Sequence, residues 1–425
     1  MNVTEKHKQW LQLVASKDDL ESKEKAELLS ALKNMDETEK EDAFYRDLAF
    51  GTGGLGGVLG AGTNRMNLYT VAKASQGLAN YVKKHFTSPS VAVGYDSRIK
   101  SDLFSKTASS VFAANGIQVW LYPELMPTPC LSYAVRSLSC SAGVMITASH
   151  NPSRYNGYKV YGADGCQITT AAAAEILGEI NSLDLFSDVR QADFGAAFSS
   201  GCIRLISDDV VTSFTEEVKH QSVLFGDEVN RDVTIVYTPL NGTGLKPVTR
   251  ALHESGFTDI RMVSEQEKPD GNFSTLTCAP NPENPEAFTL AFQLAKKVGA
   301  SVIFATDPDC DRLGVAVLDG QGEWHLLTGN QIGCVLLHYI LSTRKKLGTL
   351  PKNAAACKSI VSTSLANRIC ESYGVKMFEV LTGFKFIGEK IQQFQDTGEY
   401  TFQFGFEESY GFLSSSFVRD KDGVN

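Results

Sequence analysis

A serine on a tight turn and a lysine ten residues later are the residues of this chain best suited to group-transfer chemistry. Ser149 follows an apolar run, Val144 to Ile146, and its turn closes at Asn151-Pro152. The apolar run predicts a buried strand, and nothing bulky surrounds the serine hydroxyl on the turn. Lys159 adds a cation that can carry a proton. A serine presented at a strand end beside a positive group suits phosphoryl or acyl transfer.

Two alternatives apply to this serine. A plain β-turn that happens to contain a serine would account for the local sequence, and a serine hydrolase would use the neighbouring His150. Adjacent Ser149 and His150 side chains point in different directions, however, and no Gly-x-Ser-x-Gly elbow occurs. A serine hydrolase is therefore disfavoured, whereas the plain turn and a group-transfer serine both stay open at this point.

An acidic loop offers a metal site. Asp307, Asp309 and Asp311 stand on alternate residues after a second apolar run. Extended backbone lets such side chains surround one hard cation, and ligation by oxygen alone suits Mg²⁺. Cys310 is interpreted as a packed residue and not as a ligand. A solvated acidic turn is the plain alternative, and a haloacid-dehalogenase-type phosphatase, with Asp307 as nucleophile and Asp309 as acid, is the main rival. That rival leaves the serine unexplained.

A third polar loop pairs a carboxylate with a hydroxyl. Glu407 and Ser409 lie two residues apart, which suits the binding of vicinal sugar hydroxyls, although a solvated turn has the same composition. Lys385 precedes them and could equally be a surface lysine at a helix start. The stretch Gly51 to Gly56 fits Gly-x-Gly-x-x-Gly, but no convincing strand precedes it and no Walker lysine follows, so we reject a nucleotide site.

The pattern of elements repeats three times along the chain. Each unit is predicted as strand, helix, strand, long connection, strand, polar loop and return strand. The return strands are expected at Tyr158 to Tyr161, Gly314 to Leu318 and Gly411 to Leu413. This alternation predicts an α/β protein of three consecutive α/β/α domains with mixed sheets and helices on both faces. Ligand loops gather at strand ends, so the three polar loops are expected to converge on one cleft.

The expected boundaries follow from turn-rich segments. They give a helical lead-in at residues 1–45, domain I with the serine at 46–200, domain II with the acidic loop at 201–322, and an incomplete domain III at 323–425.

Composition limits the partners. The chain has 425 residues, a net charge of -9 and a pI near 5.4, which argues against nucleic-acid and anionic-membrane binding and requires a locally positive pocket for an anionic substrate. No apolar run is long enough to span a membrane, and the charged N-terminus is unlike a secretory signal. Nine cysteines without a Cys-x-x-Cys pair indicate reduced thiols and a cytoplasmic protein. The sequence does not reveal the oligomeric state.

The string from Gly143 to Lys159 resembles the active-serine loop of the α-D-phosphohexomutases, the phosphoglucomutases and phosphomannomutases. The resemblance implies that Ser149 carries a phosphoryl group, that Mg²⁺ binds Ser149 and the three aspartates, and that a sugar 1,6-bisphosphate is the activator. It also implies the substrate-binding residues, which are Arg312, Glu407, Ser409, Thr382 and Lys385. Gly60 to Asn67 is similar to the phosphoglucomutase-2 and phosphopentomutase branch.

Three departures from that family stand out. Gly56 replaces an arginine that faces the active site, and Arg65 is considered as a partial substitute. Asn241 replaces a frequent histidine. The resemblance stops at Asp420 to Asn425, so we expect the fourth domain, with its phosphate-binding loop, to be absent.

The sequence thus predicts a mutase that interconverts a sugar 1-phosphate and a sugar 6-phosphate, or a pentose 5-phosphate, through phosphoserine and a bisphosphate. Lys159, with its pKa lowered toward neutrality, is expected to be the general acid/base, and His150 to orient the serine. A catalytically impaired, truncated sugar-phosphate-binding protein is the alternative. The sequence does not choose between glucose, mannose, deoxyribose and ribose phosphates.

Overall fold

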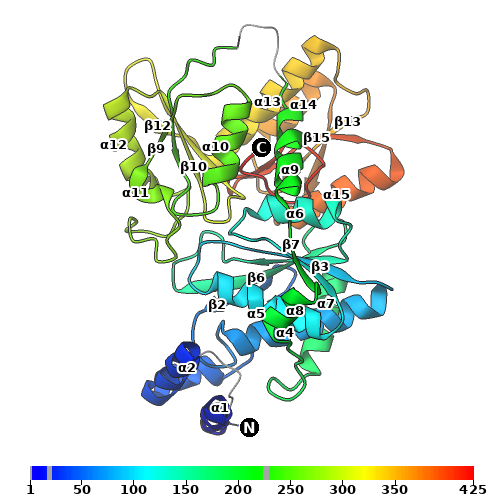
Figure 1. Ribbon diagram of the computed structural model, residues 1–425. Coiled ribbons are helices and arrows are strands. Elements are labelled where there is room, and N and C mark those ends of the chain that lie inside the picture. The colour runs from blue at the N-terminus through cyan, green and yellow to red at the C-terminus, as the bar shows by residue number, and fades with distance from the viewer. Residues whose placement is uncertain (1, 17–21, 224–228) are drawn as a thin grey trace.

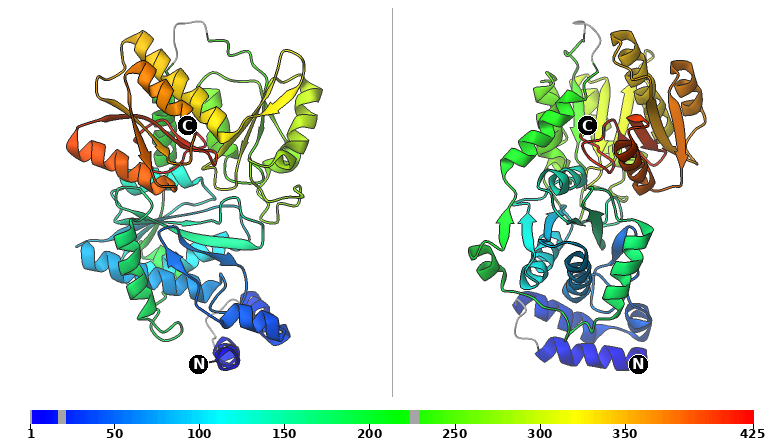
Figure 2. Two further views of the ribbon diagram at one scale, coloured as in Figure 1. Left: turned by 180° about the vertical axis from the view of Figure 1, so that it is seen from behind. Right: turned by 90° about the vertical axis from the view of Figure 1, so that its right-hand side faces the viewer.

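Three helices precede the first sheet in the computed structural model, which describes residues 2–16, 22–223 and 229–425. They are α1 (Val3–Ser16), α2 (Ser22–Asn34) and α3 (Glu37–Phe44). Trp10 packs edge-on against Phe44 and Tyr69, which ties the helices to domain I. Figures 1 and 2 show these helices at the end of domain I that is remote from the other two domains.

Domain I is built on a seven-stranded sheet in the order β1-β2-β6-β5-β3-β4-β7. Its elements are β1 (Phe50–Gly51), β2 (Gly54–Val58), α4 (Leu68–His85), β3 (Ser90–Tyr95), α5 (Ser101–Ala114), β4 (Gln118–Leu121), α6 (Thr128–Ser137), β5 (Ala142–Ile146), β6 (Tyr155–Gly162), α7 (Thr170–Asn181), α8 (Phe194–Ser199) and β7 (Ile203–Leu205). Strand β7 lies beyond the expected boundary at residue 200 and pairs with β4, so the first sheet extends to Leu205.

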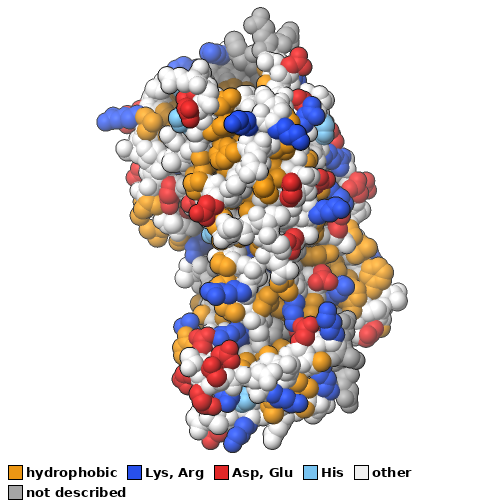
Figure 3. Space-filling model, turned by 90° about the vertical axis from the view of Figure 1, so that its left-hand side faces the viewer, with side chains coloured by type: hydrophobic (Ala, Val, Ile, Leu, Met, Phe, Trp, Pro, Cys, Tyr) orange, Lys and Arg blue, Asp and Glu red, His pale blue; other side chains and the backbone are white. Residues whose placement is uncertain are grey.

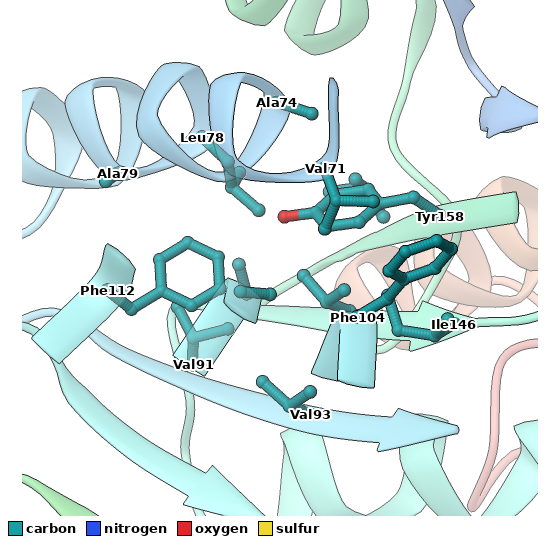
Figure 4. Close-up of a cluster of buried hydrophobic side chains, with 14 of the residues drawn as sticks. Val71, Ala74, Leu78, Ala79, Val91, Val93, Phe104, Phe112, Ile146 and Tyr158 are labelled. Carbon is teal, nitrogen blue, oxygen red and sulfur yellow. The ribbon is translucent and has the colours of Figure 1, made fainter. Parts of the chain in front are cut away.

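The core of domain I explains why its central strands are apolar. All five residues of β5 are buried, because helices cover both faces of the sheet. On one face, Phe104 and Phe112 of α5 meet Val91 of β3 and the apolar side of α4 (Figure 4). On the other face, α6 packs Leu131 against the strands.

Domain II carries a five-stranded sheet in the order β12-β11-β10-β8-β9. Its elements are α9 (Asp208–His220), β8 (Ile235–Thr238), α10 (Leu245–Glu254), β9 (Ile260–Met262), α11 (Ser264–Glu267), the 3₁₀ helix η1 (Pro285–Phe288), α12 (Thr289–Val298), β10 (Val302–Thr306), β11 (Leu313–Leu318) and β12 (Trp324–Leu326).

Domain III carries a four-stranded sheet in the order β14-β13-β15-β16. Its elements are α13 (Gly329–Leu347), β13 (Ala354–Ser359), α14 (Leu365–Tyr373), β14 (Lys376–Val380), α15 (Phe384–Thr397), β15 (Thr401–Glu407) and β16 (Gly411–Leu413).

One strand order is common to the three sheets. From one side to the other, each has a return strand, the third strand of the unit, the first and the second: β6-β5-β3-β4, β11-β10-β8-β9 and β16-β15-β13-β14. The return strand is antiparallel to its neighbour and the others pair in parallel, which confirms the predicted mixed sheets. The polar loops therefore leave equivalent strand ends.

Domains II and III lie side by side above domain I (Figure 1). An isolated β-bridge between Arg312 and Gly411 joins the acidic loop of domain II to the third polar loop. On the face drawn in Figure 3, basic and acidic side chains are interspersed. Among the described residues, no helix combines the length and the apolar character needed to cross a membrane.

Candidate active site

The serine loop, residues 147–154 between β5 and β6, is held by one buried guanidinium. Arg98 donates hydrogen bonds to the carbonyl oxygens of Ser149 (2.5 Å), Pro152 (3.0 Å) and Tyr155 (3.0 Å), and to that of Asn151. Ser149 itself has a φ of 49°, a conformation that few non-glycine residues adopt. The carbonyl contacts hold this strained turn, which places the serine hydroxyl against Asp307 of domain II.

Asp96 is the ionic partner of that guanidinium. Both side chains are 0% exposed, and the Arg98 Nε lies 3.5 Å from the Asp96 Oδ2. Thr147 Oγ1 donates to Asp96 at 2.6 Å and accepts from the Ser149 backbone N–H at 2.8 Å. Burial raises the pKa of Asp96, while Arg98 acts in the opposite direction. This pair provides the structural framework of the serine loop.

The Ser149 hydroxyl meets domain II. Ser149 is 8% exposed, and its Oγ donates to Asp307 Oδ2 at 2.7 Å and lies 3.2 Å from His150 Nδ1. Burial, and then the charge of Arg312, lower the pKa of His150 to about 3, so its imidazole is neutral at physiological pH. Two of the predicted loops, far apart in sequence, thus meet at the serine.

The three aspartates form a compact oxygen cluster. Asp307, Asp309 and Asp311 are 0% exposed, and one oxygen from each lies within 4.8 Å of the others. Asp307 Oδ1 accepts backbone N–H groups from Asp311 (3.1 Å) and Arg312 (3.0 Å). Burial, and then the neighbouring carboxylates, raise the pKa of Asp307.

Two oxygens of this cluster make the fit to a metal specific. Asp309 Oδ1 and Asp311 Oδ1 are buried without a hydrogen-bond partner among the described residues. Buried carboxylate oxygens normally have partners, and hard divalent cations take oxygen ligands. The aspartate cluster therefore has the donor set and the free lone pairs that a metal ion requires.

Two lysines contact the cluster. Lys159 Nζ, from β6, lies 2.7 Å from Asp309 Oδ2 and 3.2 Å from Asp311 Oδ2. Burial would lower the pKa of Lys159, but the two carboxylates raise it well above its ordinary value. The two carboxylates therefore oppose the expected lowering of the pKa of Lys159.

Lys421 is a site residue that the sequence did not predict. Its Nζ lies 3.1 Å from Asp311 Oδ2, and its side chain is 11% exposed. Asp420 beside it accepts hydrogen bonds from Tyr161 (2.8 Å) and Gln167 (2.9 Å) of domain I. The charged segment Arg419 to Asp422, directly after a return strand, is the sequence signal that would have pointed here.

Cys310 and Arg312 complete the acidic loop. Cys310 is buried against Tyr237 and Val248, as the sequence indicates. Arg312 Nη1 donates to Glu283 Oε1 at 2.6 Å, and the Arg312 side chain is 14% exposed. Arg312 thus follows the cluster with its guanidinium held by a carboxylate from the same domain.

The sugar loop, residues 407–411 between β15 and β16, is anchored at its base. Glu407 is 5% exposed and accepts the Gly383 N–H at 2.6 Å, and burial raises its pKa despite the nearby Lys421. Ser409 is partly exposed and Thr382 is exposed. Polar groups of this loop are therefore available to a ligand.

Lys385 joins domain III to domain I. It stands in the first turn of α15, and its Nζ donates to Thr52 Oγ1 at 2.5 Å. Thr52 belongs to the glycine-rich stretch that precedes β2. Lys385 is thus an interdomain residue at a helix start rather than a free surface lysine.

Comparison with known proteins agrees with this arrangement. Residues 47–186, 212–320 and 328–425 match, in this order, the alpha/beta/alpha domains I, II and III described for phosphoglucomutase/phosphomannomutase. The chain belongs to the phosphoglucomutase/phosphomannomutase family. Phosphoglucomutases of Staphylococcus haemolyticus and Staphylococcus aureus (strain N315) are each 39% identical to it, over 91% of this chain and 69% and 68% of theirs.

Solved structures share the fold. A phosphoglucomutase/phosphomannomutase family protein of Burkholderia thailandensis has a TM-score of 0.69 at 20% identity and covers 89% of this chain and 74% of its own. Parafusin, a Paramecium phosphoglucomutase in its open form, has a TM-score of 0.65 at 19% identity. The match covers 89% of this chain and 69% of parafusin. Membership of the family, with these curated relatives, makes the chain a phosphosugar mutase, an isomerase; the phosphatase and pure binding-protein alternatives are not favoured.

Two positions that depart from the family, and the candidate substitute Arg65, have local explanations. Arg65 pairs with Asp42 of the lead-in helices and donates to that residue's carbonyl at 3.2 Å, so it does not substitute for the missing arginine. Gly56 lies on β2 opposite Gly157, and a Cβ there would have no heavy atom within 4 Å. Asn241 has a φ of 59° and braces a turn by donating to the Lys268 carbonyl at 2.8 Å.

Proposed function

We propose that this phosphosugar mutase moves a phosphoryl group between O1 and O6 of glucose phosphate, with Ser149 as the phosphoryl carrier and glucose 1,6-bisphosphate as the intermediate. The observation that carries the proposal is the 2.7 Å contact between Ser149 Oγ and Asp307, which joins a nucleophile to a carboxylate cluster across two domains. The curated relatives named phosphoglucomutase support glucose as the sugar.

The reaction has two halves. In the first, the bond from phosphorus to Ser149 Oγ breaks as phosphorus bonds to the free hydroxyl oxygen of the sugar. The hydroxyl loses its proton to a base, and Ser149 Oγ gains a proton, which leaves free serine and a bisphosphate. In the second half, the other phosphoryl group returns to Ser149 Oγ and the proton transfers reverse.

Asp307, Asp309 and Asp311 would hold Mg²⁺, with Ser149 completing the set. The two unpartnered Oδ1 atoms and the all-oxygen donor set support this assignment. A divalent cation bound there supplies charge stabilisation for the transferring phosphoryl oxygens.

Lys159 and Lys421 are the proposed proton carriers, because both ammonium groups contact the same Asp311 Oδ2. Lys159 comes from the strand that follows the serine loop, so we assign it to Ser149 Oγ. Lys421 lies against the sugar loop, where its side chain occupies the space that a Cβ on Gly411 would need. We therefore assign Lys421 to the sugar hydroxyl and His150, as a neutral imidazole, to orienting the serine.

The sugar is proposed to bind at the sugar loop. Glu407 and Ser409 would accept and donate hydrogen bonds to its hydroxyls, and the exposed Thr382 faces the same region of domain III. Lys385 and Arg312 would contact the phosphate groups as cations.

Phosphorylation of Ser149 tests the proposal directly. The chain is incubated with glucose 1,6-bisphosphate and Mg²⁺ and analysed by intact-protein mass spectrometry. One added phosphate should appear, should vanish in Ser149→Ala and should persist in the matched control Ser153→Ala. A label on an aspartate would instead favour the phosphatase chemistry, and equal rates with mannose or ribose bisphosphates would contradict the assignment to glucose.

A further inference from the structure

We propose that Glu283 is a positioning residue: it binds one side of the Arg312 guanidinium and so directs the other side at the phosphoryl group being transferred. The inference rests on the proposed function, because it assumes that a phosphate reaches Arg312. Glu283 lies in the segment 280–283, which precedes the 3₁₀ helix η1.

The contact itself is short and sheltered. Glu283 Oε1 accepts from Arg312 Nη1 at 2.6 Å, and the two side chains are 34% and 14% exposed. A carboxylate on Nη1 leaves the edge formed by Nε and Nη2 for a second anion, and arginine commonly binds phosphate through such an edge. Arg312 Nε is buried and has no hydrogen-bond partner in the described ranges.

The free edge belongs to the reaction site. The Arg312 backbone N–H donates to Asp307 Oδ1 at 3.0 Å, and Arg312 bridges to Gly411 of the sugar loop. The Arg312 Nε–H has no acceptor in the described ranges. A phosphate of the substrate, bound in the site, would supply that acceptor.

The segment that carries Glu283 is itself braced. The Glu283 backbone N–H donates to Asn281 Oδ1 at 3.1 Å, which closes a local turn. Pro282 is buried against Gly314 of β11, where an added Cβ would lie 2.8 Å from both the Pro282 Cβ and its carbonyl oxygen. A rigid support of this kind fixes the guanidinium direction, and small errors in direction lower rates strongly.

The first experiment separates rate from binding. The rate of Ser149 phosphorylation is measured against the concentration of glucose 1,6-bisphosphate for the native chain, Glu283→Ala, Glu283→Gln and the matched control Glu286→Ala, an exposed glutamate of the same segment. Glu283→Ala should lower the maximal rate about 10- to 100-fold, Glu283→Gln less because an amide oxygen still accepts from Nη1, and Glu286→Ala should not differ from native. An unchanged maximal rate in Glu283→Ala would overturn the inference.

The second experiment needs no turnover. Binding of the bisphosphate is measured by calorimetry in the Ser149→Ala background, with and without Glu283→Ala. Removing a carboxylate beside the ligand's phosphate should leave affinity unchanged or raise it up to about fivefold. A general structural defect would weaken binding and lower the melting temperature, and that result would refute a positioning role.

The third experiment is a double-mutant cycle. If Glu283 acts through Arg312, Glu283→Ala should have no further effect on rate or affinity once Arg312 is alanine, whereas independent effects would add. If the effects of Glu283→Ala and Arg312→Ala on rate add, the inference is wrong. Failure of the native chain to phosphorylate Ser149, with Arg312-dependent coupling still present in the binding cycle, would count against the proposed function alone.

Discussion

The serine loop of domain I and the sugar loop of domain III leave the same position in equivalent sheets, yet they are held in different ways. The serine loop is fixed by the fully buried Arg98, which reaches three of its carbonyl oxygens and that of Tyr155 at the start of β6. The sugar loop is held by hydroxyl and backbone groups instead. Glu408 accepts hydrogen bonds from the hydroxyls of Ser359 (2.7 Å) and Ser362 (3.0 Å), and the Tyr410 carbonyl oxygen accepts the Leu313 N–H at 3.1 Å. Ser409 stays partly exposed.

The difference teaches which part of the site must be rigid. In the proposed reaction, Ser149 has to return to one position in both half-reactions, and its strained turn is held by its surroundings. The sugar has to present two different oxygens in turn, so its binding groups need accessible hydroxyls and less fixed surroundings. The first prediction below removes the guanidinium that holds the serine loop. The others test how far the two loops differ in their effects on stability, substrate binding and rate.

Removing the central guanidinium should have the largest effect. Arg98→Ala leaves Asp96 as an unpaired buried carboxylate, so the free energy of unfolding should fall by about 5 kcal/mol, the upper end for a broken buried ion pair, because the loop carbonyls also lose their donor. Urea denaturation measures this loss. Arg98→Lys keeps the positive charge but lacks the planar guanidinium that contacts several carbonyl oxygens at once. This variant should fold, and it should phosphorylate Ser149 roughly 100-fold more slowly than the native chain. The exposed Arg154, stacked on Tyr155 in the same loop, provides the control Arg154→Ala, which should match native.

A buried carboxyl on the domain III side forms no ion pair with any described residue and should make stability depend on pH. Asp422 is 4% exposed, and its Oδ1 accepts backbone N–H groups from Val424 (2.9 Å) and Asn425 (3.1 Å). Burial raises the pKa of Asp422 from 3.8 to about 7. The protonated form is the stable one, so its contribution is complete below pH 3.8 and is lost as pH rises through about 7.

Asp422→Asn cannot ionise and should abolish this loss. At about 1.4 kcal/mol for each unit of pKa difference, the variant should exceed native by roughly 4 kcal/mol at most near pH 8 and equal it near pH 4. Melting temperatures across that range measure the difference, with the exposed Asp209→Asn as control. Parallel curves for native and Asp422→Asn would show that the carboxyl is not buried as described.

Weakening the base of the sugar loop should act mainly on substrate binding. Glu408→Gln replaces two hydrogen bonds to a charged acceptor with neutral ones, so stability should fall by about 1 kcal/mol. The KM for glucose 1-phosphate should rise roughly fivefold, which corresponds to that energy, while the maximal rate of Ser149 phosphorylation stays within about twofold. Glu389→Gln, exposed on α15, is the control. If Glu408→Gln changes the rate of Ser149 phosphorylation more than it changes KM, the two loops do not differ in the way described.

Adding the family's arginine should have the smallest effect on stability. Gly56→Arg introduces a side chain where nothing lies within 4 Å of the Cβ, so unfolding should change by no more than about 0.5 kcal/mol. The positive charge beside the serine loop should raise the phosphorylation rate, by about tenfold at most. Gly116→Arg, at a site that is also open but has a φ of 73°, tests whether any added arginine has this effect; it should destabilise without raising the rate.

Local sequence determined the elements and much of the site chemistry. The return strands at β6, β11 and β16 were predicted from the repeated pattern of strands and polar loops, and β11 alternates buried with half-buried residues as a strand does. The aspartates 307, 309 and 311 and Ser149 could be assigned because each stands after an apolar run, and equivalent strand ends meet in space. The outlines of three mixed sheets therefore required no knowledge of tertiary contacts.

Tertiary structure decided which charges face one another. From the sequence, Lys421 and Glu283 were not assigned to the site, whereas Arg65 was considered for it. The residues adjacent in sequence do not show which residue of another domain a side chain contacts. The pKa of Lys159 likewise depends on two carboxylates that lie 150 and 152 residues away in sequence. Sequence specifies which groups are present and which strand carries them, whereas desolvation and Coulomb energies depend on distances that only the packed domains set.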